Sequence, residues 1–236
     1  MRGKLSRIFP FAVALICLGS FLLAAGCGSS KARYRFIQTA TGLPASSVDL
    51  QVDGKSVQTA IGFAQTATYH SSSSGSRKFD VFPNGNTTNA IVSQSVNLGS
   101  GDTTLLLQNT APNSNFVLST YADDNTAPTT GNAKLRIIHS SFSANAVDVY
   151  IVTQGTGIGG LSPNIGNVTF QKATDYQVLG AGSYTIIMTV AGTQNILNNL
   201  NFSLNPLAAG QIRTLVVVDS SFGGGPFSIV QLNDLN

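Results

Sequence analysis

Apolar and polar residues alternate along many short stretches of the chain, which is typical of β-strands that bury one face. In residues 48–52 the first, third and fifth positions are apolar and expected to point inward, and residues 147–151 repeat this order. Residues 215–218 are apolar throughout, which predicts a central strand. The same reasoning predicts further strands over residues 78–82, 91–98, 103–108, 115–121, 183–190, 196–204, 212–219 and 227–232.

The chain also contains an internal duplication. Residues 32–38 resemble residues 133–139, and residues 47–52 resemble residues 146–151. Four further residues recur at a constant spacing of 107, namely Phe63, Tyr69, Gly75 and Ser76, which match Phe170, Tyr176, Gly182 and Ser183. The largest insertion in the second copy is the glycine-rich stretch 155–166.

Each copy has the length and turn spacing of a two-sheet β-sandwich of about seven strands. Turn residues such as Asn84-Gly85 and Ala191-Gly192 separate the apolar stretches. We therefore expect an all-β protein with one antiparallel sandwich over residues 32–125, a linker over residues 126–132 and a second sandwich over residues 133–236.

The first residues resemble the signal peptide of bacterial lipoproteins. Residues 1–26 combine a cationic start, an uncharged apolar run and small residues before Cys27. The resemblance implies that the Cys27 thiol receives a diacylglycerol and that the new amino terminus is then acylated, for example with palmitate. Residues 27–31 then form a lipidated tether outside the cytoplasm. In a bacterium with two membranes, the resemblance implies that Gly28, in place of aspartate, favours the outer membrane. The alternative is an uncleaved signal anchor.

Composition supports this organisation. All ten acidic residues are aspartate, and the chain has no glutamate and no tryptophan, which disfavours long surface helices. No disulfide is expected, because Cys17 leaves with the leader and Cys27 is acylated. Without the leader the chain has ten basic and ten acidic residues, so no electrostatic case for nucleic acid remains. Lys31, Arg33 and Arg35 are expected either to form a solvated tether, which we favour, or to contact anionic headgroups.

The run from Leu135 to Ser141, with residues 146–150 and Gly182 to Thr185, resembles domain-of-unknown-function family 4397, a group of bacterial extracytoplasmic domains. The second copy fits the family pattern well. The first copy departs from it at Gln38, where histidine is usual, and at Arg77, which replaces the aromatic residue found at Tyr184. The resemblance implies immunoglobulin-like or related sandwiches at a surface and no established activity.

Residues suited to catalysis are few. The chain has two histidines, of which His70 precedes an expected serine turn over residues 71–74. His139 ends a predicted strand near Ser140, Ser141 and Asp148, but neighbouring strand residues point to opposite faces. We therefore expect His139 to form hydrogen bonds at a strand end, and we expect no enzyme.

No metal or cofactor site is expected either. Asp123, Asp124 and Asn125 have oxygen ligands for calcium but lack the spacing of a calcium loop, so a polar interdomain turn is favoured. The glycine-rich residues 155–160 have no following helix to present to a phosphate, which indicates a hairpin insertion.

Arg35 and Asp49 recur as Arg136 and Asp148 in the second copy, on strands predicted to be neighbours. The recurrence predicts either a duplicated ligand site or a structural role, and we favour the structural role. In that role each pair forms a cross-strand ion pair, or each aspartate forms hydrogen bonds to a turn. Each arginine is expected near the aspartate of its own copy.

The sequence thus favours a non-enzymatic, lipid-anchored envelope or cell-surface protein that serves as a spacer, adhesion or interaction module. Its expected partners are the membrane, through the lipid, and an envelope protein or glycan. The alternative is a glycan- or peptide-binding module; six tyrosines and no tryptophan are present for stacking on sugar rings.

Overall fold

The computed structural model describes residues 31–65, 67–111 and 114–234, so the leader over residues 1–26, Cys27 and most of the expected tether lie outside the described part. All elements in the described part are β-strands, which confirms the all-β prediction. None of its segments is a helix of the length and apolarity needed to cross a membrane.

The first eight strands form two four-stranded sheets, ordered β4-β1-β7-β8 and β3-β2-β5-β6. Their bounds are β1 Lys31–Gln38, β2 Ser47–Val52, β3 Lys55–Gly62, β4 His70–Ser73, β5 Gly75–Pro83, β6 Val92–Leu98, β7 Gly101–Ala111 and β8 Ser114–Asp123.

The next eight strands repeat this topology, in sheets ordered β12-β9-β15-β16 and β11-β10-β13-β14. Their bounds are β9 Asn132–His139, β10 Val147–Thr153, β11 Ile165–Val168, β12 Gln177–Gly180, β13 Gly182–Val190, β14 Ile196–Leu207, β15 Ile212–Val218 and β16 Ser228–Asn233. The strand pairs are antiparallel except for β1 with β7 and β9 with β15, which are parallel. This parallel pair in each copy departs from the expected fully antiparallel sandwich.

The alternation in the sequence defines the core of each copy. Val48 and Leu50 of β2 pack against residues such as Phe36 and Phe79 in the first core, and Val147 and Val149 of β10 occupy the matching positions in the second. The predicted central strand is β15, which lies between β9 and β16 and is buried on both faces over residues 214–218.

Two segments differ from expectation. The serines after His70 form β4, an edge strand that pairs with β1, rather than a flexible turn. Residues 31–35 are also strand and not tether, because β1 begins at Lys31 and pairs with both β4 and β7. The basic residues near the expected anchor therefore belong to a sheet.

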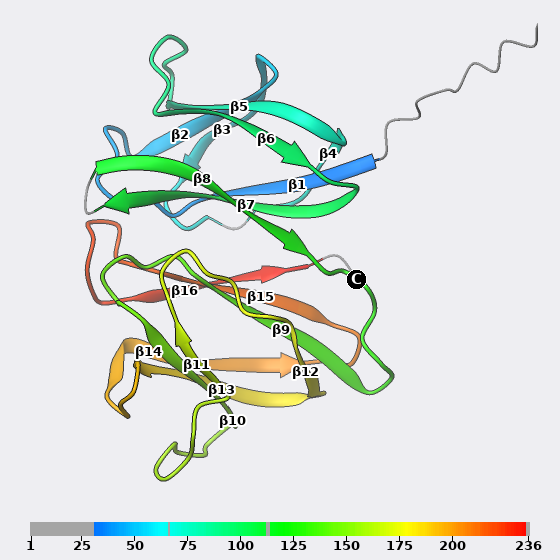
Figure 1. The fold of residues 1–236 in the computed structure, drawn as a ribbon, viewed down its shortest axis with the longest axis vertical. Helices are drawn as coiled ribbons and strands as arrows, with labels where there is room; N and C mark the ends of the chain where they lie inside the picture. Colours follow the sequence, from blue (N-terminus) through cyan, green and yellow to red (C-terminus); the bar gives the residue numbers. More distant parts are fainter. Residues whose placement is uncertain (1–30, 66, 112–113, 235–236) are drawn as a thin grey trace, which may run out of the picture.

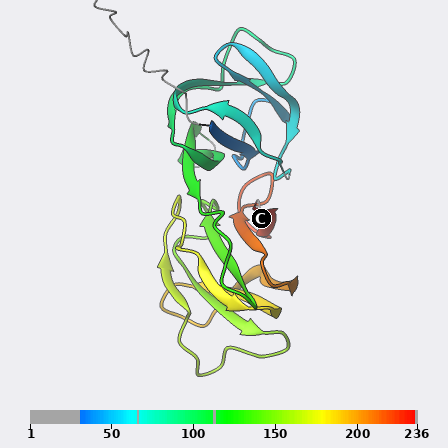
Figure 2. The same ribbon diagram turned by 90° about the vertical axis from the view of Figure 1, so that its right-hand side faces the viewer.

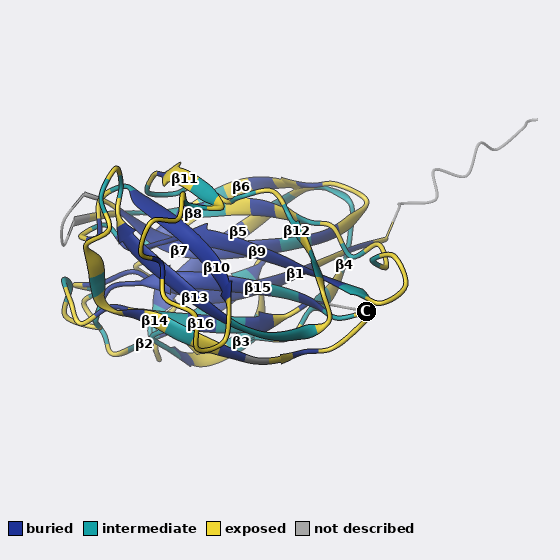
Figure 3. Cartoon of the chain, turned by 90° about the horizontal axis from the view of Figure 1, so that it is seen from below, coloured by how far each residue is buried: buried dark blue, intermediate teal, exposed yellow. Residues whose placement is uncertain are grey.

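The two sandwiches are stacked along the long axis of the molecule (Figures 1 and 2). A third apolar cluster lies between the two sandwiches. It contains residues from β1, β7 and β8 of the first copy and from β9, β15 and β16 of the second. In each copy these strands belong to one sheet, and the outer face of that sheet is therefore buried against the other copy. The central strands of the two facing sheets, β1, β7, β9 and β15, are largely buried (Figure 3). The cluster consists of Ile37, Leu106, Tyr121, Ile138, Val216, Val218, Val230 and Leu232.

Candidate functional site

The recurring arginines lie at the junction between the two copies and do not contact the expected aspartates. Arg35 donates a hydrogen bond from Nη2 to Asp234 Oδ1 of the second copy, at 2.5 Å. Arg136 donates to Asp123 of the first copy. The expected pairing with Asp49 and Asp148 is wrong, because β1 and β2, like β9 and β10, lie in opposite sheets of a sandwich.

Each junction arginine has the same surroundings. The Arg35 guanidinium lies 4.7 Å from the centre of the Tyr69 ring, and Arg136 lies 4.7 Å from that of Tyr176. The Tyr69 hydroxyl donates to Asp123 at 2.6 Å, and the Tyr176 hydroxyl donates to Asp234 at 2.8 Å. Burial raises the pKa of both tyrosines, and the neighbouring carboxylates add to this, so both hydroxyls remain donors.

Asp49 and Asp148 instead hold the turns of their own copies. Asp49 accepts hydrogen bonds from the backbone N–H of Ala60 at 2.8 Å and of Gly85 at 2.9 Å. Asp148 accepts from the N–H of Gly192, the equivalent of Gly85, at 2.7 Å. Burial opposes ionisation of Asp49, but its hydrogen bonds outweigh this and lower its pKa. Of the alternatives drawn from the sequence, the structure shows the hydrogen bonds to a turn.

His139 occupies a structural position at the end of β9. Its Nε2 lies 2.5 Å from the carbonyl oxygen of Asn145, and its Nδ1 accepts the N–H of Ser141 at 3.3 Å. A neutral ring with hydrogen on Nε2 satisfies both contacts, and burial lowers the pKa of His139. Ser141 donates to Asp219 at 2.5 Å. Because His139 and Ser141 are fully buried and Asp148 holds a turn, these residues form no accessible triad.

The acidic run that begins at the last residue of β8 is an interdomain contact. Asp123 belongs to the junction described above, and Asp124 accepts a hydrogen bond from Lys134 Nζ at 2.7 Å, which lowers the pKa of Asp124 to about 2. In the described residues no cluster of histidine, cysteine and carboxylate side chains has the arrangement of a metal site.

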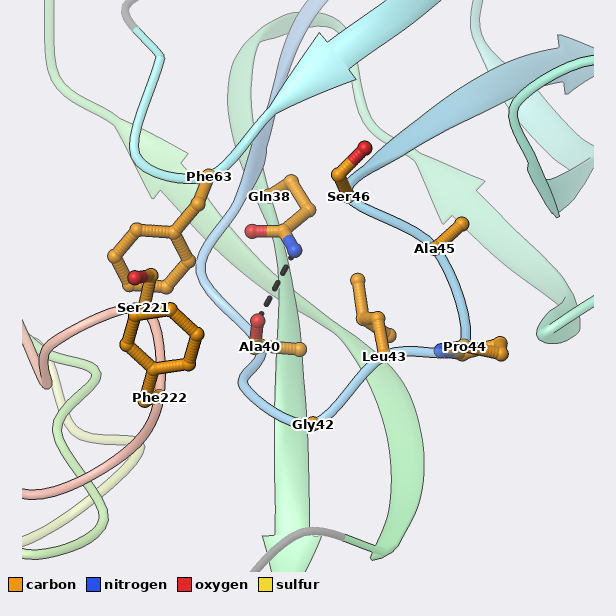
Figure 4. A pocket seen from close by; sticks show the side chains of 10 residues that line it. All are labelled: Gln38, Ala40, Gly42, Leu43, Pro44, Ala45, Ser46, Phe63, Ser221 and Phe222. Atoms are coloured by element: carbon orange, nitrogen blue, oxygen red, sulfur yellow. Dashed lines mark hydrogen bonds between the residues drawn. The ribbon is translucent and has the colours of Figure 1, made fainter.

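A groove of about 720 Å³ opens beside the junction (Figure 4). The first copy contributes Gln38, Phe63 and the loop over residues 40–46, and the second copy contributes Ser221 and Phe222. No charged side chain lines it. A neutral surface built by both copies is therefore available to a ligand or partner.

Two lining residues stand out. Phe222 is 92% exposed, although burial of a phenylalanine side chain is favourable by about 2 kcal/mol. Gln38 is 3% exposed and donates from Nε2 to the carbonyl of Ala40 at 3.0 Å, while its Oε1 has no hydrogen-bond partner in the described structure. Figure 4 shows this oxygen turned toward Phe63. The groove thus offers uncharged, aromatic surface, and the unpaired Gln38 oxygen lies beneath that surface, out of reach of a ligand.

Sequence reasoning did not identify this groove. Apart from Gln38 at the end of β1, its residues come from loops, where the alternation of apolar and polar positions predicts nothing. One available signal was Phe222 itself, which stands next to Gly223, Gly224 and Gly225, residues that form turns and leave no strand face to bury a ring.

Comparison with known families gives a clear assignment. The model of a domain of unknown function, DUF4397, matches residues 31–150. The chain belongs to this family. The DUF4397 match spans the whole first copy together with β9 and most of β10, despite the departures at Gln38 and Arg77. None of the curated proteins matches the chain.

Solved structures show weak likenesses to this DUF4397 protein. The C-terminal domain of AlgF from P. aeruginosa has a TM-score of 0.29 at 12% identity, covering 45% of this chain and 100% of that domain. A streptococcal virulence factor that binds α-glucan has a TM-score of 0.29 at 10% identity, covering 84% and 95% of the two chains. A putative cell adhesion protein from Bacteroides fragilis has a TM-score of 0.23 at 12% identity, covering 86% and 98%. Likenesses this weak carry no functional information.

Proposed function

We propose that this protein is a non-enzymatic interaction module of the bacterial envelope, anchored outside the cytoplasm by a lipid on Cys27. Its two sandwiches act as one body, and the partner binds at the groove beside their junction. The observation that carries the proposal is the 92% exposed Phe222 at a groove that neither copy forms alone. Exposed aromatic side chains next to a concave surface are typical anchors of protein interfaces.

Catalysis has little support in the described residues. The histidine of the only sequence-based candidate triad is buried and engaged with backbone groups. The groove contains no histidine, carboxylate or lysine that could transfer a proton.

A second candidate is a small neutral ligand, either a glycan or a peptide segment, in the same groove. It is favoured by the aromatic side chains of Phe63 and Phe222 in the lining, against which the face of a sugar ring or an apolar peptide side chain packs. The uncharged lining disfavours anionic and cationic ligands.

The groove is tested by binding of the labelled chain from Cys27 onward to isolated envelopes that lack the protein. Phe222→Ser is expected to weaken binding about tenfold, or about 1.4 kcal/mol. Val178→Ser, which removes a 58% exposed apolar residue from β12, is the matched control and is expected to bind like the wild type. Equal binding of wild type and Phe222→Ser contradicts a role for the groove.

The partner class is then resolved with glycan and peptide arrays. A signal that is lost in Phe222→Ser identifies a small ligand, whereas blank arrays with retained envelope binding indicate a protein partner. Lipidation has its own test, because mass spectrometry of native protein distinguishes acylated Cys27 from a free thiol. Cys27→Ser is expected to release the protein from the membrane.

A further inference from the structure

Half of the basic residues that follow the leader gather at one end of the first copy. They are Lys31, Arg33, Lys55, Arg77 and Lys78, five of ten, and we call this surface the basic end. It includes the start of β1 beside β4, which Figure 1 shows at the outer edge of the first sandwich.

The strand register brings these residues together. Lys31 lies opposite Ser73, whose carbonyl accepts a hydrogen bond from Arg77 at 3.1 Å. Arg77 also reaches Asp53 at 3.4 Å, and the Asp53 carboxylate accepts the backbone N–H of Lys78 at 2.9 Å. Lys55 begins β3 on the other side of the same turn, opposite Val52.

The basic end keeps a positive surplus. Three of its cations pair with aspartates, Arg33 with Asp102 at 2.6 Å, Arg77 with Asp53 at 3.4 Å and Lys78 with Asp80 at 3.0 Å. Lys31 and Lys55 are exposed, and neither forms an ion pair within the described residues. Two positive charges therefore remain unbalanced on this surface.

The fold itself does not require these charges. In the second copy the position of Lys31 is taken by Asn132, and the positions of Arg77 and Lys78 are taken by Tyr184 and Thr185 in the same strand pairing. The same sandwich thus forms with neutral residues at these three positions, whereas Arg33 keeps a basic counterpart in Lys134.

We propose that the basic end docks on anionic lipid headgroups and sets how the anchored molecule stands on the membrane. The inference rests on the proposed lipidation of Cys27. Lys31 is the fourth residue after Cys27. An extended chain spans at most about 3.6 Å per residue, so the Cα atoms of Lys31 and Cys27 lie within roughly 14 Å of each other. Attraction between the lysines and anionic headgroups acts over about 8 Å at physiological salt, and a tether this short keeps the basic end close enough to the bilayer to enter that range.

The test replaces the native lipid by a chemical one. The chain from Cys27 to Asn236 has a single cysteine, which is coupled to a maleimide-bearing lipid in vesicles. An amine-reactive ester acylates the exposed lysines, and mass spectrometry measures the rate at each lysine. The rates are compared between neutral phosphatidylcholine vesicles and vesicles rich in phosphatidylglycerol. We expect Lys55 and Lys78 to react at least about threefold more slowly on the anionic vesicles. The exposed Lys172 of the second copy is expected to react at equal rates.

Salt and variants complete the test. Near 1 M salt, where screening acts within about 3 Å, the difference between vesicles is expected to vanish. Lys31→Gln with Lys55→Gln should abolish the protection of Lys78, whereas Lys172→Gln with Arg213→Gln, the same change in charge on the second copy, should leave it. Equal rates at Lys78 on both vesicles, or equal slowing of Lys172, overturn the docking. Because the tether is chemical, either result leaves the lipidation of Cys27 to its own measurement.

Discussion

At the scale of single residues, the junction arginines show how this fold accommodates buried charge. The side chains of Arg35, Asp123 and Asp234 are all 0% exposed. An ion in such a place is stable only when partners replace its water. Each guanidinium has a carboxylate, a threonine hydroxyl and a tyrosine ring, so loss of one partner leaves another charge uncompensated.

His139 gives a pH dependence whose sign follows from its surroundings. Burial lowers its pKa below the ordinary value of about 6.5, so below that pH the unfolded chain binds a proton that the folded chain does not. The free energy of unfolding is therefore unaffected above about pH 6.5. It is expected to fall by up to about 1.4 kcal/mol per pH unit as the pH drops toward the lowered pKa.

Urea denaturation between about pH 7 and pH 5 checks this slope. The His139→Asn variant is expected to be less stable than the wild type, but its free energy of unfolding should not fall between about pH 7 and pH 5 in the way attributed to His139. His70→Asn changes a half-buried histidine on β4 and serves as the control that retains it. A slope that persists in His139→Asn assigns the pH dependence to other groups.

At the scale of elements, the insertion over residues 155–166 has a packing role. Ile158 covers Tyr150 and Val152 on the face of β10 that points away from the core, together with Ile187 of β13. This explains why β10 is buried at six successive positions, although its inward face repeats the alternation of β2. The insertion therefore protects the outer face of one sheet.

Shortening Ile158 tests that role. Ile158 is 7% exposed, so Ile158→Ala is expected to lower the free energy of unfolding by about 2 kcal/mol, through lost contacts and a residual cavity. Leu161→Ala, at a 46% exposed position of the same insertion, is expected to change it by less than about 0.5 kcal/mol. Chemical denaturation of both variants gives the comparison, and equal effects contradict a specific contact by Ile158.

The elements also show what the sequence can and cannot predict. Period-two alternation found β2 and β10 because one face of each is apolar, and the duplication implied that both copies share one topology. Alternation does not reveal what covers the outer face of a sheet. Arg33 and Arg35 alternate with core residues and therefore look solvent-exposed, yet Arg35 is buried by the second copy.

The groove was beyond prediction for a related reason. Phe222 and Leu43 are far apart in the sequence and lie in loops, so their proximity depends on how the two sandwiches stack. The short β4 was missed because its four residues, His70–Ser73, carry no apolar pattern, and its pairing with β1 is made by the backbone and by one ring contact, between His70 and Tyr34.

At the scale of the whole molecule, the junction has approximate two-fold symmetry. Arg35 contacts Asp234 as Arg136 contacts Asp123, and Tyr69 and Tyr176 occupy matching places. The same face of each copy is used, as in isologous contacts between identical subunits. The apolar cluster beside these ion pairs is fully desolvated at Ile37, Leu106, Ile138 and Val216, so the two copies are held together by more than the linker.

Cleavage of the linker tests whether the junction suffices. A protease site inserted after Pro128, between β8 and β9, allows the folded chain to be cut. We expect the two halves to co-elute in gel filtration, because the apolar cluster and the crossed ion pairs remain. Ile138→Asp places a charge in the cluster without entering either sandwich core, so its halves are expected to separate after cleavage.

Val178→Asp introduces the same charge at a 58% exposed position of the same sheet, and its halves should stay together. Separation of the wild-type halves would show that the linker alone holds the copies, and the groove at Phe222 would then lose its fixed shape. Retention in the wild type and in Val178→Asp, with separation in Ile138→Asp, makes the duplicated sandwich a single body. A partner at the groove then contacts both copies, and the first copy connects that partner to the lipid anchor that we propose at Cys27.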